Sequence, residues 1–426
     1  MHQRVLDDLQ TPDCYFIFPS RVYVFDHEKK CAFVILWGEN KASLEKGLSE
    51  IDSFFQDAEK EITPDFSQAL SKYNVNRTPR PRSSSLKEVV QKVLHKAFSR
   101  VSFFGPSHEL KSNLSRDQYI SKVEGIREYI RAGETYQVNF SQRFSFPFSD
   151  DSFRIFERLT SLNPSPFQAY FQCPKISIAS CSPERLVSVQ PAHLDGSFFD
   201  GVFFDGRSFD RSFFEKRFFD GHSFAQDSNF LKDLKHSEWV VETRPIKGTI
   251  SRGKTQEEDE KNQKALLESV KDNAELSMIV DLARNDLGRV CRVGTIEVNE
   301  HRVLEGYSHV WHTVSNIRGV LERGKDFSHV IRAVFPGGSI TGCPKKRTME
   351  IIDEMEDFKR GVYTGSAGYI GFDGAMDLNI MIRTLVHTSG KVYFHSGGGI
   401  VFDSDPEKEY QETLDKAAAL KESILY

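Results

Sequence analysis

The 426-residue sequence lacks the features that mark several specialised classes of protein. Its six cysteines are scattered, without a CxxC pair or metal-ligand spacing, which favours reduced thiols over a disulfide framework. The N-terminus, MHQRVLDDLQTPD, has no apolar core, so a signal peptide is not expected. No apolar run approaches the ~20 residues that span a bilayer. We therefore expect a soluble, cytoplasmic protein with no membrane partner.

The sequence also lacks an excess of basic residues, since its net charge is −5. Proteins that bind nucleic acids use lysine and arginine stripes to contact phosphates, and no such stripe stands out here. A nucleic-acid partner is therefore not expected. At 39% hydrophobic and 27% charged, the composition is that of an ordinary globular protein that is long enough to bury a large core.

The chain is patterned more clearly in its later part. Residues 1–110 carry strand-like runs but no chemical motif, and we expect them to be an N-terminal part of the same fold as residues 111–426. In the later part, we predict a helix capped by Ser115, a long helix over 263–288, a strand over 290–298 and a last helix capped by Asp405. Helices and strands come in mixed order, which favours an α+β fold with largely antiparallel sheets.

A phenylalanine-rich segment interrupts this pattern between two strand-like runs, at about residues 191–236. From 196 to 224 its sequence repeats every five residues, with Phe-Phe or Ser-Phe pairs in register. One interpretation is a short β-solenoid that binds a partner, but stacks of this kind need neighbours to cover their ends. The favoured interpretation is a surface insertion without function, because lengthening a loop costs little closure entropy.

Two late helices each carry a row of acids on one face. Asp272 and Glu275 lie three residues apart, and Glu409, Glu412 and Lys416 follow offsets of three and four. Such rows usually face solvent. The first row, however, precedes the apolar run MIVDL, which predicts a helix buried over much of its surface. A buried acid needs a partner, and a hard cation such as Mg²⁺ is a suitable one.

Glycine-rich stretches and one arginine indicate an anionic ligand. The segment PGGSITGCPKKR is not a Walker A loop, but its glycines would expose backbone N–H groups beside the Thr341 hydroxyl. The run at Gly397–Gly399 offers similar donors, and Arg383 lies in a strand where a guanidinium would suit a carboxylate. Tight turns are the alternative explanation for the glycines. Together with the acidic helices, these features predict a small polyanion held through its carboxylates and a metal.

Lys247, within the segment RPIKGT, is the candidate nucleophile. A lysine between apolar neighbours is usually a surface residue whose stem packs on the protein, but a buried amine becomes nucleophilic. We expect the strands that flank the insertion to pair as a hairpin, which would bring Glu184 close enough to act as an acid or base. His312 is a second candidate proton carrier, although a lone histidine in a strand is more often structural.

From about Ser115 to its C-terminus, the sequence resembles the chorismate-utilising enzymes, which include anthranilate, aminodeoxychorismate, isochorismate and salicylate synthases. The resemblance implies a layered sandwich of large, mostly antiparallel sheets with helices on the outside. It rests on ordered segments that include SPERL, ETRPIKGT, NAELSMIVDLARNDLGR, PGGSITGCPKKR and GGGIVFDSDPEKEYQETLDKA.

The resemblance implies a role for each matching position. Glu275 and Glu412 match the glutamates that hold Mg²⁺, and His312 matches a histidine near the reacting ring. The positions that match groups binding or lining the substrate are Thr341, Gly342, Tyr369, Arg383, Gly398, Gly399 and Lys416.

Two positions distinguish the activities within the family. Hydrolytic members of the family resemble one another in having a lysine that activates water. At the matching position this sequence has Gln137. Anthranilate synthases typically read PIAGT, whereas the PIKGT of this sequence resembles the aminodeoxychorismate synthases of folate (4-aminobenzoate) synthesis. The resemblance thus implies that Lys247 attacks chorismate and that ammonia then displaces it, with Glu184 moving the protons. Component I of anthranilate synthase is the alternative, and a protein that binds a partner through its repeat is the non-enzymatic one.

A partner subunit is also implied by the resemblance. Ammonia normally reaches such enzymes from a separate glutaminase, and this sequence shows no Cys/His/Glu glutaminase pattern, so a heterodimer is expected. The N-terminal third of the sequence shows no Leu-Leu-Glu-Ser motif of the kind associated with tryptophan binding in anthranilate synthases, so feedback inhibition by tryptophan is not expected.

Overall fold

The computed structural model describes residues 6–9, 11, 21–26, 31–36, 110–192, 238–307, 310–371 and 374–425. The chain divides into two compact units, Met1–Asp13 with His108–Tyr426, and Cys14–Ser107. In the second unit, β1 (Arg21–Asp26) and β2 (Cys31–Leu36) pair in antiparallel orientation. None of the described helices combines the length and apolar character needed to cross a membrane. The phenylalanine-rich repeat lies outside the described residues.

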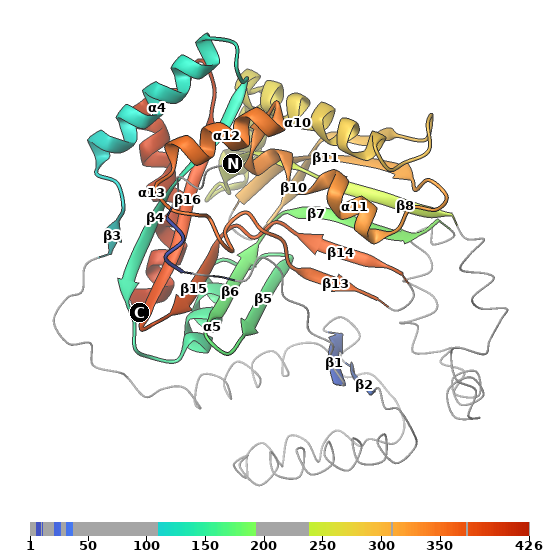
Figure 1. Ribbon diagram of the computed structural model, residues 1–426, viewed down its shortest axis with the longest axis horizontal. Helices are drawn as coiled ribbons and strands as arrows, with labels where there is room; N and C mark the ends of the chain where they lie inside the picture. The colour runs from blue at the N-terminus through green and yellow to red at the C-terminus, as the bar shows by residue number, and fades with distance from the viewer. Residues whose placement is uncertain are drawn as a thin grey trace, which may run out of the picture. The chain divides into compact units, whose positions relative to one another are not determined.

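The first of two seven-stranded antiparallel sheets in the larger unit is built around the long pair β4 and β16 (Figure 1). Phe144 and Phe394 stack across this pair with ring centroids 5.1 Å apart, and both are buried. The strand order is β12 (Gly342–Cys343), β4 (Gln137–Pro147), β16 (Lys391–Ile400), β15 (Thr384–Thr388), β6 (Ser177–Ser182) and β5 (Phe167–Gln172), with β3 (Lys111–Ser112) paired to β4.

The second sheet carries the hairpin that flanks the repeat. Strands β7 and β8 pair in antiparallel orientation, as predicted, and the Ala192 N–H donates to the Glu238 carbonyl at 2.6 Å where the repeat leaves the sheet. The strand order is β10 (Glu297–Gly306), β11 (Val310–Val320), β8 (Trp239–Arg244), β7 (Arg185–Pro191), β14 (Met376–Asn379) and β13 (Gly368–Ile370), with β9 (Ile246–Ser251) paired to β11.

Two of the steps that carry the chain from one sheet to the other are short and lie next to each other. One is the step from β6 to β7 through Pro183 and Glu184, and the other is the step from β14 to β15 through 380–383. The Ile380 N–H donates to the Glu184 carbonyl at 3.0 Å, and the Cys181 N–H donates to the Arg383 carbonyl at 3.1 Å. These bonds hold two of the predicted site residues at the junction of the sheets.

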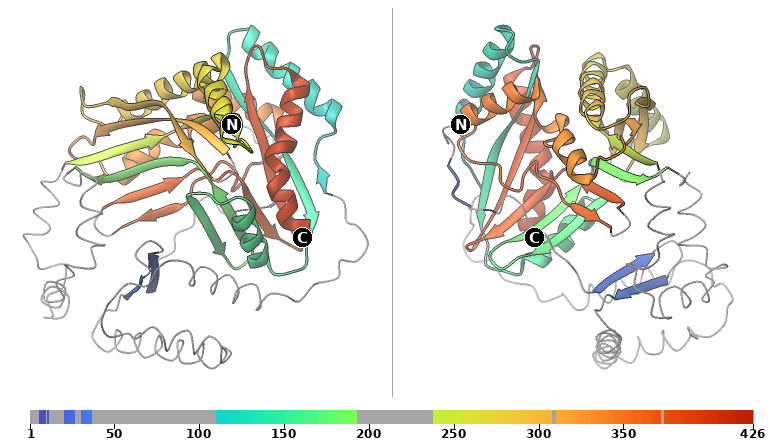
Figure 2. Two further views of the ribbon diagram at one scale, coloured as in Figure 1. Left: turned by 180° about the vertical axis from the view of Figure 1, so that it is seen from behind. Right: turned by 45° about the vertical axis from the view of Figure 1, so that its right-hand side comes forward.

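Helices pack on both sheets, and α13 runs along β16 (Figures 1 and 2). Helix α10 packs on β9 and β11, and α12 packs on β4. Their buried faces form apolar cores, one of which joins Leu276 and Val280 of α10 to Val187, Val241 and Ile317 of the second sheet. The helices are α4 (Arg116–Arg131), α5 (Ser152–Leu162), α9 (Gln256–Glu268), α10 (Val270–Gly288), α11 (Phe327–Val334), α12 (Lys345–Met355) and α13 (Pro406–Leu425), with a short 3-10 helix η1 (Gly338–Ile340).

The predicted α+β class, with antiparallel sheets and packed helices, is confirmed, and so are the caps at Ser115 and Asp405. Two predicted elements are wrong. The long helix over 263–288 is interrupted at Ser269, whose extended backbone ends α9 and whose hydroxyl accepts from Asp272 N to start α10. The strand predicted from 290 begins only at Glu297, because Gly294 turns the chain with φ of 80°.

Candidate functional site

Lys247 is held by a distorted pairing of β9 with β11. Its carbonyl accepts from the Thr313 hydroxyl, and Gly248 next to it has φ of 81°. A Cβ at Gly248 would lie 2.8 Å from Thr313 Oγ1, so glycine is needed for this close approach. The Lys247 side chain is 15% exposed, and its Nζ lies 3.8 Å from Glu275 Oε2 on α10. The sequence could not decide between a surface and a buried lysine, and this lysine is mostly buried.

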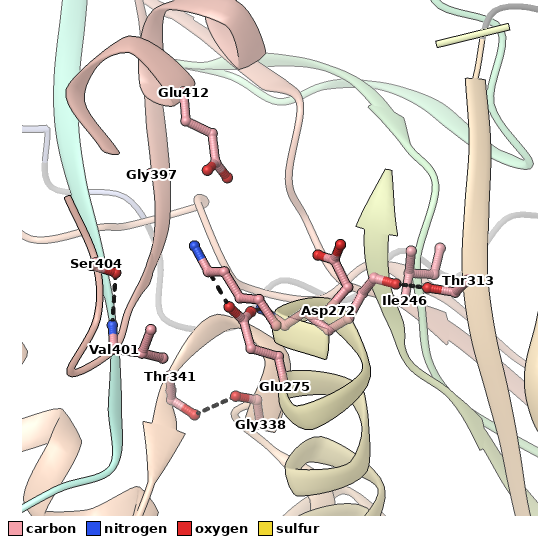
Figure 3. Close-up of polar contacts among 12 residues, drawn as sticks. Ile246, Asp272, Glu275, Thr313, Gly338, Thr341, Gly397, Val401, Ser404 and Glu412 are labelled. Carbon is pink, nitrogen blue, oxygen red and sulfur yellow. Dashed lines mark hydrogen bonds and ion pairs between the residues drawn. The ribbon is translucent and has the colours of Figure 1, made fainter. Parts of the chain in front are cut away.

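Acids and lysines from two helices meet beside Lys247. Figure 3 shows the carboxylates of Glu275, from α10, and Glu412, from α13, directed into the same space. Lys416 Nζ lies 2.6 Å from Glu412 Oε1, and Lys271 Nζ lies 3.4 Å from Glu409 Oε1 and 4.0 Å from Glu275 Oε1. Two helices far apart in the sequence therefore share one cluster of charges, as the matching rows of acids led us to expect.

The electrostatics differ between the two glutamates predicted to hold a metal. Burial raises the pKa of Glu275, although Lys247 and Lys271 oppose this effect. Burial also tends to raise the pKa of Glu412, but the nearby ammonium groups, Lys416 foremost, lower it below its usual value. Positive charge thus holds Glu412 ionised, as a hard metal ion would.

Glycines let these helices and strands approach closely. A Cβ at Gly398 would lie 3.2 Å from Glu409 Oε2 and 3.4 Å from Glu412 Oε1. A Cβ at Gly399 would lie 2.6 Å from Gln137 Nε2, and Lys416 Nζ donates to the Gly397 carbonyl at 3.1 Å. The glycine run of β16 therefore lies directly under the acids of α13. The predicted glycines are part of the cluster, and they bring Gln137 to its edge.

Glu184 is a deeply buried acid near the cluster, with 5% of its surface exposed. Its Oε1 accepts from the Ile246 N–H at 3.4 Å, the residue before Lys247. Burial raises its pKa, while the Ser339 hydroxyl and the charge of Lys247 act in the opposite direction. A carboxyl group whose pKa is raised and that lies beside a buried lysine is suited to general acid catalysis.

His312 lies in β11 opposite Thr249, whose hydroxyl is 2.8 Å from His312 Nδ1. The histidine is 2% exposed. Burial, together with the charge of Arg383, lowers its pKa to about 4, so the ring is neutral at neutral pH. A neutral imidazole can donate or accept one hydrogen bond but supplies no positive charge.

Arg383 is a mostly buried cation that has no carboxylate partner within 4.0 Å among the described residues. Its Nη1 donates to Asn163 Oδ1 at 3.0 Å. Burial lowers the pKa of Arg383, which shows that its charge is poorly compensated. A buried guanidinium that has no carboxylate partner is suited to bind the carboxylate of a ligand.

The remaining predicted positions fall into two groups. Thr341 and Gly342 follow η1 and pair with the start of β4, and the Thr341 hydroxyl donates to the Gly337 carbonyl at 2.8 Å. Both Gln137 and Thr341 are buried there. Tyr369 instead lies on the edge strand β13 and is 60% exposed, so its place in a substrate pocket stays a prediction.

Sequence reasoning left two residues of the cluster out of the predicted site. Glu409 is 3% exposed and accepts from the Ser404 hydroxyl at 2.7 Å, so it is not the solvated acid that its row suggested. Lys271 pairs with it. The signal that could have identified Glu409 is its spacing of three residues from Glu412, because this spacing places both side chains on one face of the helix.

The donor set fits a divalent cation that is shared with a ligand. Carboxylate oxygens are the ligands that Mg²⁺ prefers, and Mg²⁺ usually keeps several positions for water or substrate oxygens. In the part of the chain that the structure describes, no group of three or more His, Cys, Asp or Glu side chains is arranged to enclose a metal. Glu275 and Glu412 would therefore supply two ligands, and an anionic ligand and water would supply the others.

The sequence is similar to those of several known proteins. Residues 2–197 and 234–422 match the family model for chorismate binding enzymes, and the break falls at the repeat. The chain is 36% identical to the aminodeoxychorismate synthase component 1 of Bacillus subtilis (strain 168), over 98% of this chain and 72% of that protein. It is 33% identical to the anthranilate synthase component 1 of Acetivibrio thermocellus, over 98% of this chain and 70% of that protein.

A solved structure shares the fold. The crystal structure of anthranilate synthase component I from Streptococcus pneumoniae TIGR4 matches with a TM-score of 0.72 and 27% sequence identity. The match covers 98% of this chain and 76% of that one.

Proposed function

The chain belongs to the chorismate-binding enzymes, and from that premise we propose that it is the synthase component that converts chorismate and ammonia to 4-amino-4-deoxychorismate. The observation that carries the choice of product is Lys247. Its amine is mostly buried, lies 3.8 Å from Glu275 and follows the residue whose N–H contacts Glu184. The family and its use of chorismate rest on the whole chain, whereas the product rests on this lysine.

Chorismate would be held through its two carboxylates. Arg383, which has no carboxylate partner among the described residues, and Lys416, which lies beside the β16 glycines, would bind them. Glu275 and Glu412 would hold Mg²⁺, which as a Lewis acid fixes and polarises the ring carboxylate when bound. Fixing both ends of a rigid substrate places its ring carbons against Lys247, which lowers the entropic barrier to attack.

The chemistry would proceed in two displacements. In the first, the lone pair of the Lys247 amine bonds to C2 of the ring, both ring double bonds shift, and the C4 hydroxyl leaves as water with the proton of Glu184. In the second, ammonia bonds to C4 and the C2–Nζ bond breaks, which returns Lys247 as a neutral amine. The Glu184 carboxylate takes the proton that the new C4 ammonium loses. Covalent catalysis thus divides one difficult substitution into two easier ones.

Ammonia would come from a separate glutaminase subunit. The relative from B. subtilis is named a component 1, which implies a second component. We therefore expect a heterodimer in the cell, with free ammonium salts able to replace the partner in the test tube.

The product assay tests the proposal. Purified protein with chorismate, Mg²⁺ and an ammonium salt is expected to form 4-amino-4-deoxychorismate, identified by mass and by chromatography against an anthranilate standard. Anthranilate as the main product would instead support component I of anthranilate synthase, the second candidate, which several relatives and the solved structure favour. If no aminated product formed at any concentration of Mg²⁺ or ammonium salt, both candidate functions would be refuted.

Lys247→Ala tests the nucleophile. Turnover is expected to fall by at least about a hundredfold, because the covalent route is lost. Lys264→Ala is the matched control, since that lysine on α9 has a side chain that is 74% exposed. Intact-protein mass spectrometry of quenched wild-type enzyme should also show an adduct that the Lys247→Ala protein lacks. Unchanged turnover by Lys247→Ala would remove this lysine from the mechanism.

A further inference from the structure

A small cavity has the side chain of Glu184 in its lining. It has a volume of about 30 Å³ and lies between β7, β8, α10 and η1. Its lining includes Glu184, Thr243, Ile279, Ala283, Asp286 and Ser339. A water-sized molecule needs roughly 10–15 Å³ of such space, so the cavity holds one or two of them and excludes chorismate.

The polar atoms of this cavity suit a small hydrogen-bonding guest. The Ser339 side chain is 7% exposed, and its hydroxyl has no hydrogen bond of good geometry within the described segments, although it is close enough to influence Glu184. Asp286 is 6% exposed, and its Oδ2 lies 2.6 Å from Lys345 Nζ. Buried polar groups with unused hydrogen-bonding capacity are costly unless a small molecule satisfies them.

Glu184 connects this cavity to the reacting groups. It is the only residue of the predicted catalytic, metal-binding and substrate-binding set among those that line the cavity. Pro245, two residues before Lys247, is also part of the lining. A molecule in the cavity therefore lies beside the residue that is to exchange protons with the reacting groups.

We infer that this cavity is the site where ammonia waits before it attacks C4. The inference rests on the proposed amination, and it assigns the second substrate to a place of its own. Ammonia has the size of water, and its three N–H groups can donate to the Ser339 hydroxyl and the carboxylate oxygens at the wall. When it moves past Glu184, its nitrogen bonds to C4, the C2–Nζ bond breaks, and Glu184 accepts the released proton.

Filling the cavity tests the inference. Ala283→Val adds two methyl groups at its wall, while Ala265→Val makes the same change at an exposed position of α9 as a control. At fixed pH and saturating chorismate, Ala283→Val is expected to raise the KM for ammonium at least fivefold and to leave the KM for chorismate within twofold. An unchanged KM for ammonium, or an equal rise in both constants, would overturn the inference.

Enlarging the cavity gives a second measurement that does not depend on the first variant folding. Ile279→Ala removes three carbons from the wall and is expected to let methylamine form an N-methylated product, which mass spectrometry detects. The wild type is expected to form this product at least tenfold less efficiently than the ammonia product. Equal use of both amines by the wild type would contradict a one-molecule site. Wild-type protein that makes no aminated product at all would refute the proposed function itself, which separates the two failures.

Discussion

Arg383 allows a substrate-binding role to be separated from a structural one, because the two roles predict opposite changes. Within the described chain its guanidinium bonds to Asn163 but has no carboxylate within ion-pair distance. Replacing it with methionine removes one hydrogen bond, worth about 1 kcal/mol, and also removes the cost of burying an unpaired charge. We therefore expect Arg383→Met to change the free energy of unfolding by less than about 1 kcal/mol.

The same variant should bind chorismate poorly. Removing one partner of a buried charge pair costs roughly 2–5 kcal/mol, and 2 kcal/mol corresponds to about a thirtyfold rise in Kd. The assay is a calorimetric titration with chorismate in the presence of Mg²⁺, together with urea unfolding of the same preparations. A rise in Kd of at least about thirtyfold with nearly unchanged stability is the expected pair of results.

Arg143→Met is the control with the opposite pattern. Arg143 is 7% exposed, and it binds Asp8 with both Nη atoms, at 2.6 and 2.7 Å. It also covers the Phe358 ring at 3.6 Å. Its loss should reduce stability by about 2 kcal/mol or more and leave the Kd for chorismate unchanged. If Arg383→Met instead resembled this control in both measurements, the assignment of Arg383 to a substrate carboxylate would be wrong.

Three further predictions follow from the same contacts. Because burial raises the pKa of Glu184, the folded protein binds the carboxyl proton more tightly than the unfolded chain does, and its stability falls as the pH rises above the usual carboxyl value of 4.5. Glu184→Gln should therefore melt at a higher temperature than the wild type at pH 8 and at the same temperature near pH 4. The variant should also lose turnover. Gly342→Ala should reduce the free energy of unfolding by about 2 kcal/mol or more in urea, since its Cβ would lie 1.9 Å from the Gln137 carbonyl oxygen, whereas Gly294→Ala, with open space around it, should lose less. Replacing residues 193–237 with Asn-Gly should leave the kcat for amination within threefold, and a large loss would mean that the insertion contributes to the site.

The sequence predicted those parts of the fold that depend on contacts between residues close together in the chain. The capping box of α4 was predictable because Ser115 and Gln118 exchange hydrogen bonds within four residues. The break between α9 and α10 was missed because the apolar pattern continues through Ser269, and only the turn of the backbone there shows that the serine hydroxyl caps a new helix. Sheet order was beyond the sequence pattern, since β7 pairs with β14, which follows it in the chain only after β8 to β13.

Several residues of the candidate site were identified from the sequence, but their pairings were not. The spacing of Glu275 and Glu412 within their helices was visible, but that Lys247 would reach Glu275, and that Lys271 would reach Glu409, depends on how α10, α13 and β9 pack. Burial was the other missing quantity. The sequence does not show whether a lysine or an acid is exposed or buried, and the pKa of its side chain depends on that difference.

The distance between the insertion and the site explains how the two can coexist on one hairpin. Strands β7 and β8 pair from Arg185 with Arg244 at one end to Pro191 with Trp239 at the other. The insertion leaves from the second end, while Glu184 and Lys247 lie just beyond the first, about 20 Å away for six residues of extended chain. Strand β8 is also paired with β11, so the register of the hairpin does not depend on the loop that closes it. The hairpin carries the insertion at the end opposite to Glu184 and Lys247. A long insertion at that end is therefore compatible with an intact site.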